Sequence, residues 1–249
     1  MPISIGRGII LPGDNYQRVS EISSPLMTPP DTTGLIGAYF PGVLAKKGEL
    51  YNYANSAKPL KKVGKPDLFG SFARCDSDNC FDTDIKVGTN TTMYVIARTP
   101  TAGATAVDRG LAISDWSEGP SRGVALELRT TADGLQAFGY LTPERVGSVQ
   151  VQTENRQGFN IFLFAHKDGA YAGVGIYEPS LRKFKVSNFK ADVLVPTGRN
   201  ILFGGHYSEV EFLGKQDIAG ALIYEGVTHN YDNIGNYLWD FMMPQSGMR

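Results

Sequence analysis

From Gly34 onward, apolar residues recur at every second position in short runs that end at turn residues. In one run Val124, Leu126 and Leu128 alternate with Ala125, Glu127 and Arg129, which is the pattern of a strand with one buried and one wetter face. The turns include Asp133-Gly134 and Asp168-Gly169, so segments 126–141 and 159–177 are predicted hairpins. A period of two with breakers this regular predicts an all-β chain.

Two runs, 93–97 and 159–165, are apolar on both faces, as expected for strands inside a layered stack. Asn230–Met242 is the best helical segment, because Ile234, Leu238 and Phe241 lie at helical spacing and Asn230 or Asp232 could cap its start. The pattern therefore predicts a β-sandwich or jelly roll with one short C-terminal helix.

The first 33 residues contain Gly and Pro at a density that no helix or central strand tolerates. The breakers are Gly6, Gly8, Pro12, Gly13, Pro25, Pro29 and Pro30. We expect residues 1–33 to form an extended arm that docks on its own domain or on a neighbouring subunit, followed by one jelly-roll domain over residues 34–249. A disordered tail is the alternative.

The charge balance and the hydropathy exclude several classes of protein. Formal charge is −1, from 24 Lys and Arg against 25 Asp and Glu, with no long basic stripe, so we expect no nucleic-acid partner. No run reaches the roughly 18 apolar residues of a membrane span. We see no secretory signal at the start of the sequence, and two cysteines do not make a disulfide scaffold.

Two aromatic segments with polar neighbours are the candidate ligand site. Trp116 lies between Asp115 and Glu118 on a predicted loop, and His206-Tyr207 forms a second loop. Sugar sites stack an aromatic ring on the sugar and satisfy hydroxyls with carboxylates and amides, so these five residues are the predicted glycan-binding set. In the alternative interpretation, Trp116 folds back as a plug over the end of the sandwich.

Catalysis and metal binding each have one candidate. Glu209 and Glu211 are two apart and would share one face of a strand, as a retaining glycosidase requires, although Val210 and Phe212 facing the core would explain the same pattern.

The acidic loop Cys75–Cys80 offers Asp76 and Asp78 as calcium ligands, but the EF-hand Gly and Glu positions hold Phe81 and Val87. The two thiols are either free or joined across the turn. We expect no catalytic residue, metal or cofactor.

The order of four segments resembles the laminin-G-like, concanavalin A-type jelly roll. The segments are Gly34-Leu-Ile-Gly-Ala-Tyr-Phe-Pro41, the hairpin from Gly123-Val-Ala-Leu-Glu-Leu to Asp133-Gly-Leu-Gln-Ala-Phe, the hairpin 159–177, and Ile201-Leu-Phe-Gly-Gly205 followed by Ile218-Ala-Gly-Ala-Leu-Ile-Tyr224. Gly220 replaces the acidic residue of the family pattern, and the C-terminal disulfide is missing, so a calcium site does not carry over.

The resemblance implies a non-catalytic binding module that recognises a glycan or another surface ligand. With the arm and no signal sequence, the chain also resembles bacteriophage virion components such as tail-fibre, receptor-binding or decoration proteins. That likeness implies a homo-oligomer located in the virion, or in the host cytoplasm before assembly, whose residues 1–33 contact other subunits. The alternatives are a structural assembly protein and a glycoside hydrolase that uses Glu209 and Glu211.

Overall fold

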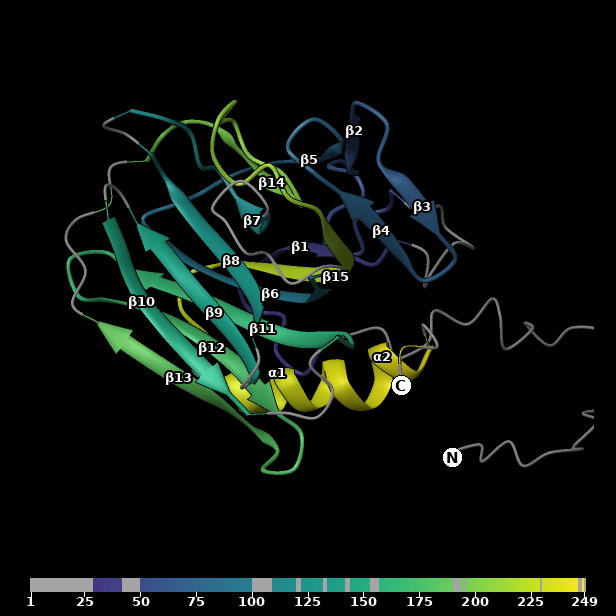
Figure 1. Ribbon diagram of the computed structural model, residues 1–249. Coiled ribbons are helices and arrows are strands. Elements are labelled where there is room, and N and C mark those ends of the chain that lie inside the picture. The colour runs from purple at the N-terminus through teal and green to yellow at the C-terminus, as the bar shows by residue number, and fades with distance from the viewer. Residues whose placement is uncertain are drawn as a thin grey trace, which may run out of the picture.

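Two antiparallel β-sheets pack face to face, and one short helical segment covers the outside of one of them (Figure 1). The computed structural model describes residues 29–41, 50–99, 109–119, 122–131, 134–141, 144–152, 157–189, 194, 196–228, 230–245 and 248. Within these residues the chain is an all-β jelly-roll sandwich, which confirms the predicted fold class.

Sheet 1 is the sheet that the helical segment covers. Its described strands are, in spatial order, β13 (Lys183–Phe189), β12 (Tyr171–Glu178), β11 (Asn160–Lys167), β6 (Asn90–Arg98), β15 (Gln216–Glu225), β4 (Phe72–Cys75) and β3 (Asp67–Phe69), with β1 (Leu35–Tyr39) also paired to β15. The predicted hairpin 159–177 is β11–β12, and it turns at Gly169, whose φ is 61°.

Sheet 2 faces the other side of the core. Its described strands are β10 (Glu144–Val151), β9 (Gly134–Leu141), β8 (Val124–Thr131), β7 (Leu111–Ser114), β14 (Asn200–Phe203), β5 (Cys80–Lys86) and β2 (Lys61–Val63). The predicted hairpin 126–141 is β8–β9, in register from Val124 opposite Leu141 to Thr131 opposite Gly134.

Alternation along β6 explains how one strand serves two hydrophobic layers. Met93 and Val95 point into the core between the sheets, whereas Tyr94 and Ile96 point outward into a second cluster beneath the helical segment. Both sets are buried, so a strand that is apolar on both faces is confirmed as part of a layered stack.

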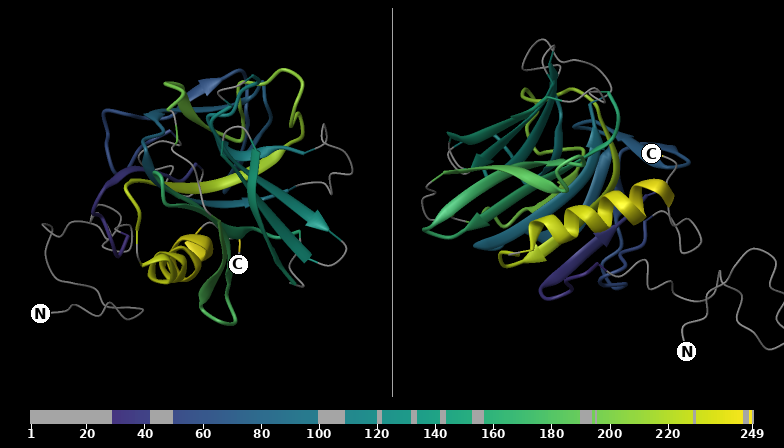
Figure 2. Two further views of the ribbon diagram at one scale, coloured as in Figure 1. Left: turned by 90° about the vertical axis from the view of Figure 1, so that its left-hand side faces the viewer. Right: turned by 90° about the horizontal axis from the view of Figure 1, so that it is seen from below.

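The C-terminal segment forms α1 (Tyr231–Tyr237), a π-helical turn η2 (Leu238–Met242) and α2 (Met243–Gln245), and Figure 2 shows it lying across sheet 1. Ile234 and Leu238 are buried as predicted, but Phe241 is 42% exposed and Met242 takes the inward position.

Asn230, one of the two predicted N-cap residues, does stand at the N-cap position of α1. The Asn230 side chain makes no capping bond, and the Asp232 carboxylate accepts a hydrogen bond from the backbone N–H of Phe184 at 2.7 Å, which ties α1 to β13.

The domain start and the arm are described only in part. Residues 1–28 lie outside the described residues, so the docking of the arm stays a prediction. The carbonyl oxygen of Asp31 accepts a hydrogen bond from the Tyr224 hydroxyl at 2.9 Å, so the last residues of the arm contact sheet 1. Among the described residues, no helix is long and apolar enough to span a membrane.

Candidate functional site

The two predicted loops lie against each other because they follow neighbouring strands. Trp116 follows β7, Tyr207 follows β14, and the two strands pair at Ser114 and Leu202. The backbone N–H of Tyr207 donates to the carbonyl of Trp116 at 2.7 Å. The structure therefore brings together both segments of the predicted glycan-binding set.

Trp116 is buried and offers no face to a ligand. It is 2% exposed, and its ring makes edge contacts with Tyr140 and Phe212 at centroid distances of 5.4 and 6.2 Å. Its Nε1–H donates to Glu211 Oε2 at 3.0 Å, and the Arg122 guanidinium lies 5.4 Å from the ring centroid. The predicted stacking platform is therefore wrong for Trp116. The alternative is correct that the ring folds back onto the protein, but the ring fills a satellite cluster on the outer face of sheet 2 and not the end of the sandwich.

Asp115 is also buried and acts as a structural acceptor. Its carboxylate accepts the N–H of Val124 at 2.6 Å and the hydroxyl of Thr197 at 2.5 Å. Burial raises the pKa of this carboxyl group, while these hydrogen bonds and the nearby Arg199 lower it. The Asp115 carboxylate thus joins two loops and is not placed to bind a sugar.

His206 is 4% exposed and is fixed by two backbone bonds within its own loop. Its Nδ1 accepts the N–H of Ser208 at 3.1 Å, so the proton is on Nε2, which donates to the carbonyl of Phe212 at 2.9 Å. Burial lowers the pKa of the imidazole, which keeps it neutral. His206 shapes the loop and does not reach a ligand.

Glu118 and Tyr207 remain at the surface. The Glu118 carboxylate accepts the Ser208 hydroxyl at 2.8 Å and the Glu209 N–H at 2.9 Å, and these bonds lower its pKa. The Tyr207 ring is 39% exposed, and its hydroxyl donates to the carbonyl of Asn200 at 3.1 Å. Of the five predicted residues, these two are still available to a ligand.

Glu209 and Glu211 lie on the irregular loop between β14 and β15, not on a strand, so the predicted pairing on one strand face is wrong. Glu211 is held by the Trp116 indole and by an ion pair with Arg122 at 3.4 Å. The alternative interpretation of this segment is half correct, because Phe212 is buried but Val210 is 64% exposed.

Glu127 was predicted on the wetter face of its strand, yet it is fully buried. Its carboxylate accepts hydrogen bonds from Arg129, from the Tyr140 hydroxyl and from Arg109 Nη1, the last at 3.1 Å. The loop that carries Phe212 packs over this face, and alternation alone cannot reveal a cover that comes from so distant a part of the sequence. The signal in the sequence was Arg129, which lies two residues from Glu127 on the same strand and can pair with its carboxylate.

The acidic loop between β4 and β5 is a tight turn. Asp76 Oδ1 accepts the N–H of Asn79 at 2.9 Å and the N–H of Asp78 at 3.2 Å, so the carboxylate serves the turn itself. Cys75 and Cys80 are both free and buried. In the described part of the chain, no three His, Cys, Asp or Glu side chains cluster in a way that could hold a metal ion.

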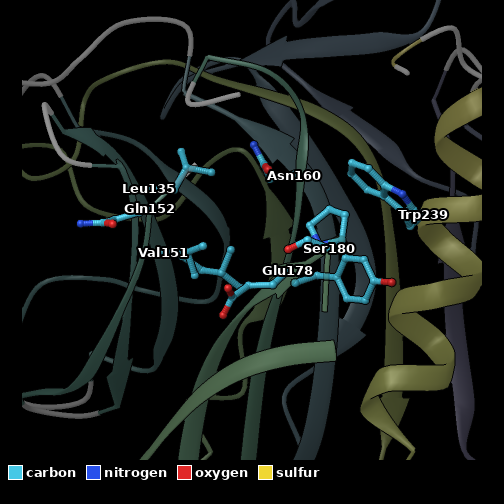
Figure 3. A pocket seen from close by; sticks show the side chains of 10 residues that line it. Leu135, Val151, Gln152, Asn160, Glu178, Ser180 and Trp239 are labelled. Carbon is cyan, nitrogen blue, oxygen red and sulfur yellow. The ribbon is translucent and has the colours of Figure 1, made fainter. Parts of the chain in front are cut away.

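A pocket that sequence reasoning missed lies at one end of the sandwich, where the two sheets and the helical segment meet. Its volume is about 90 Å³, enough for several water molecules, and its described lining residues are Leu135, Val151, Gln152, Asn160, Ile176, Tyr177, Glu178, Pro179, Ser180 and Trp239. Figure 3 shows Trp239 on the helical side of the pocket and Leu135, Val151 and Gln152 on the opposite side.

The pocket combines one aromatic ring with several groups that can bind a hydroxyl. Trp239 is half-buried and packs against Tyr177 at a centroid distance of 6.1 Å. The Tyr177 hydroxyl donates to Asn236 Oδ1 at 2.6 Å, and Gly235 packs so tightly on the Tyr177 ring that a Cβ there would lie 2.6 Å from it. These contacts fix the helical segment, and with it the indole, against sheet 1.

Comparisons with known proteins identify the fold. No protein-family model matches the sequence, and no curated protein matches it. The structure is similar to a botulinum neurotoxin serotype D ligand-binding domain in complex with N-acetylneuraminic acid, with a TM-score of 0.56 and 12% identity over 84% of this chain and 52% of that chain. It is also similar to a GH54 α-L-arabinofuranosidase, with a TM-score of 0.53 and 9% identity over 79% of this chain and 50% of that one. The chain thus spans about half the length of these structures, and the likeness confirms the jelly-roll fold.

Proposed function

We propose that this chain is a non-catalytic carbohydrate-binding module and that the pocket beside Trp239 holds the sugar. The observation that carries the proposal is the presence of an indole, the amide of Asn160, the carboxylate of Glu178 and the hydroxyl of Ser180 in the lining of one small pocket, with Gln152 at its opposite rim. A sugar needs this combination, because its C–H face packs on an aromatic ring while its hydroxyls need donors and acceptors. About half of a neurotoxin ligand-binding domain solved with N-acetylneuraminic acid shares this fold, which supports a sugar ligand by analogy at the level of the fold alone and says nothing of the charge of the sugar.

The charge of the pocket favours a neutral sugar. Glu178 is the only charged residue among the described residues that line it. The nearby cation Arg182 is bound to Asp240, with Nη2 2.5 Å from Oδ2, so its charge is already balanced. A carboxylate that faces the ligand repels an anionic sugar and accepts hydrogen bonds from the hydroxyls of a neutral one.

The exposed pair Glu118 and Tyr207 is the second candidate surface for the same function. It keeps one aromatic ring and one carboxylate of the predicted set, on a loop that also exposes Val210 and Leu213. Arg199 lies 5.7 Å from the centroid of the Tyr207 ring, which leaves less of the ring for a sugar. We therefore place this surface after the Trp239 pocket.

A glycan array and titration calorimetry on the full chain test the proposal, with Trp239→Ala as the perturbation and Tyr207→Ala as the matched control. An indole face that covers about 60 Å² of a sugar is worth about 1.5 kcal/mol, so Trp239→Ala should weaken binding about tenfold. Tyr207→Ala should leave the affinity unchanged. The reverse result moves the site to the Tyr207 loop, and a chain with no glycan affinity at all, although folded by circular dichroism, contradicts the function itself.

A structural role in an assembly is the second candidate function. The edge strands β2 and β3 expose Val63, Leu68 and Phe69, at 38%, 36% and 43%, which favours a contact between subunits. We propose that such contacts, together with residues 1–33, would place the module in a phage particle. Light scattering should then find an oligomer that Phe69→Lys dissociates; a monomeric wild-type chain would contradict the assembly role.

We expect no glycoside hydrolysis.

A further inference from the structure

Two thiols that the proposed function does not use lie where the chain passes from sheet 1 to sheet 2. Cys75 ends β4 and Cys80 begins β5, and the two side chains are 1% and 0% exposed. Between them is only the turn 76–79. Because β4 belongs to one sheet and β5 to the other, the two strands separate beyond this point.

The hydrogen bonds of the turn fix how the two cysteines face each other. The Asp76 N–H donates to the Asn79 carbonyl at 3.0 Å, and the Asn79 N–H donates to the Asp76 carbonyl at 3.3 Å. Two residues that exchange both bonds are a hydrogen-bonded antiparallel pair, so the pair next to them, Cys75 and Cys80, is of the non-hydrogen-bonded type. In such a pair the Cα atoms lie about 4.5 Å apart with both side chains on one face, which is within the Cα range of about 4.4–6.8 Å that a disulfide needs.

A second contact places the same short stretch of backbone against both cysteines. Gly204 and Gly205 pass directly over them: a Cβ built on Gly204 would lie 2.1 Å from Cys75 Cβ, and one built on Gly205 would lie 2.5 Å from Cys80 Sγ. Because the two glycines are consecutive, both cysteine side chains lie under the same short stretch of backbone.

We propose that Cys75 and Cys80 close into an intramolecular disulfide when the protein meets an oxidising environment. With glutathione disulfide as the oxidant, the first cysteine gives up its proton and attacks, forming a mixed disulfide and releasing one glutathione. The second cysteine then gives up its proton, attacks the protein sulfur of the mixed disulfide and releases the second glutathione. Two S–H bonds and one glutathione S–S bond break, and one protein S–S bond and two glutathione S–H bonds form.

The surroundings of the two cysteines make the disulfide slow to form and slow to be reduced. Burial raises the pKa of both thiols, and together with the carboxylates of Asp76, Asp82 and Asp78 it raises the pKa of Cys80 to about 12. Few thiolates are therefore present at neutral pH, and attack requires the turn to open. Once closed, the same burial shields the disulfide from external thiols. The closed pair would be a covalent staple between the two sheets, beneath Gly204 and Gly205, which precede the exposed Tyr207.

The test is oxidation of the folded full chain with glutathione disulfide, followed by denaturation, alkylation with N-ethylmaleimide and intact-mass measurement. The expected product is a monomer that has lost two hydrogen atoms and takes up no maleimide, with Cys75 and Cys80 linked in one peptide. The variant Cys80→Ser should instead keep one alkylatable thiol or carry one glutathione. Two maleimides on wild-type protein after prolonged oxidation, a stable glutathione adduct on it, or a disulfide-linked dimer would each overturn the proposal.

Oxidation of the chain in guanidinium serves as a reference, because a loop this short also closes in an unfolded chain. The folded protein should form the same bond as the unfolded one, at a lower rate that rises as guanidinium opens the turn. A folded protein that stays a dithiol while the unfolded chain closes completely would show that the native geometry forbids the bond. Neither measurement involves a glycan, so the outcome is independent of the proposed function.

Discussion

Asp217 provides the sharpest test of how the sandwich is held together. Its side chain is fully buried in β15, yet it carries a charge that two arginines from neighbouring strands satisfy. Arg74 donates through Nε at 2.7 Å and Nη2 at 3.0 Å, and Arg98 donates through Nε at 2.8 Å. The variant Asp217→Asn keeps the shape of the side chain and removes only the charge and one acceptor, so we expect a large loss of stability without a cavity.

The size of the loss follows from the three bonds. A hydrogen bond to a charged group contributes about 1.5–3 kcal/mol, and a neutral one about 0.5–1.5 kcal/mol. The amide oxygen of asparagine can replace Oδ2 and keep two bonds, each now with one charged partner in place of two, which loses about 1 kcal/mol for each. The amide N–H₂ then faces the Arg74 donor, and that bond is lost outright. Because the guanidinium groups are 31% and 30% exposed, water recovers part of the loss, and the expected net cost is about 2–4 kcal/mol.

Urea unfolding measures this cost as a lower midpoint at an unchanged slope. Asp84→Asn is the matched control, because Asp84 pairs with Lys61 at 3.3 Å on the surface, with side chains 41% and 59% exposed. An exposed pair contributes about 0–1 kcal/mol. If Asp217→Asn costs no more than Asp84→Asn, the three bonds do not stabilise the fold in the way argued above.

Three further predictions concern the loop after β14 and the cysteines beneath it. Burial lowers the His206 pKa below its ordinary value of 6.5, so the unfolded chain binds the proton first and the free energy of unfolding should fall as pH drops below about 6.5. Calorimetry should show a weaker dependence of stability on pH for His206→Gln, and an unchanged dependence would contradict the assignment. Gly204→Ala should lower the free energy of unfolding in urea by about 2 kcal/mol or more, since its φ is +69° and the new Cβ would lie 2.1 Å from Cys75 Cβ. Gly198→Ala is the control, because Gly198 has a similar φ but open space around it, and it should lower the free energy of unfolding by less. The oxidised protein should be about 2 kcal/mol more stable than the reduced one, as a closed loop of six residues predicts, and equal thermal midpoints would argue against the staple.

The sequence predicts most of the fold because its information is local. Alternation and Asp-Gly turns define hairpins such as β8–β9 without any knowledge of distant contacts. The errors arise where a distant segment changes the surroundings of a strand. Glu127 alternates as an outward residue, but the loop carrying Phe212 covers it, so a position that reads as wet is fully buried. The same loop removes Trp116 from solvent.

The Trp239 pocket was missed for a related reason. Helical spacing identifies Ile234 and Leu238 as the inward face, and Trp239 follows as a flanking residue beside Asp240. Its place in the pocket appears only when the helical segment lies against the end of β12, next to Glu178. No period in the sequence encodes that juxtaposition, which depends on Tyr177 and Gly235 packing closely together.

These two errors together limit where a ligand can bind. The loop between β14 and β15 uses Trp116, Glu211 and Phe212 to cover the outer face of sheet 2, so the rings and carboxylates that lie there already satisfy one another. The helical segment covers the outer face of sheet 1 in the same way. The end of the sandwich beside Trp239 keeps an open space within the lining contributed by β9, β10, β11 and β12. We favour the Trp239 pocket over the loops that the sequence first suggested, because Trp116 and Asp115 of those loops are engaged in contacts of their own, whereas this end of the sandwich keeps an open space.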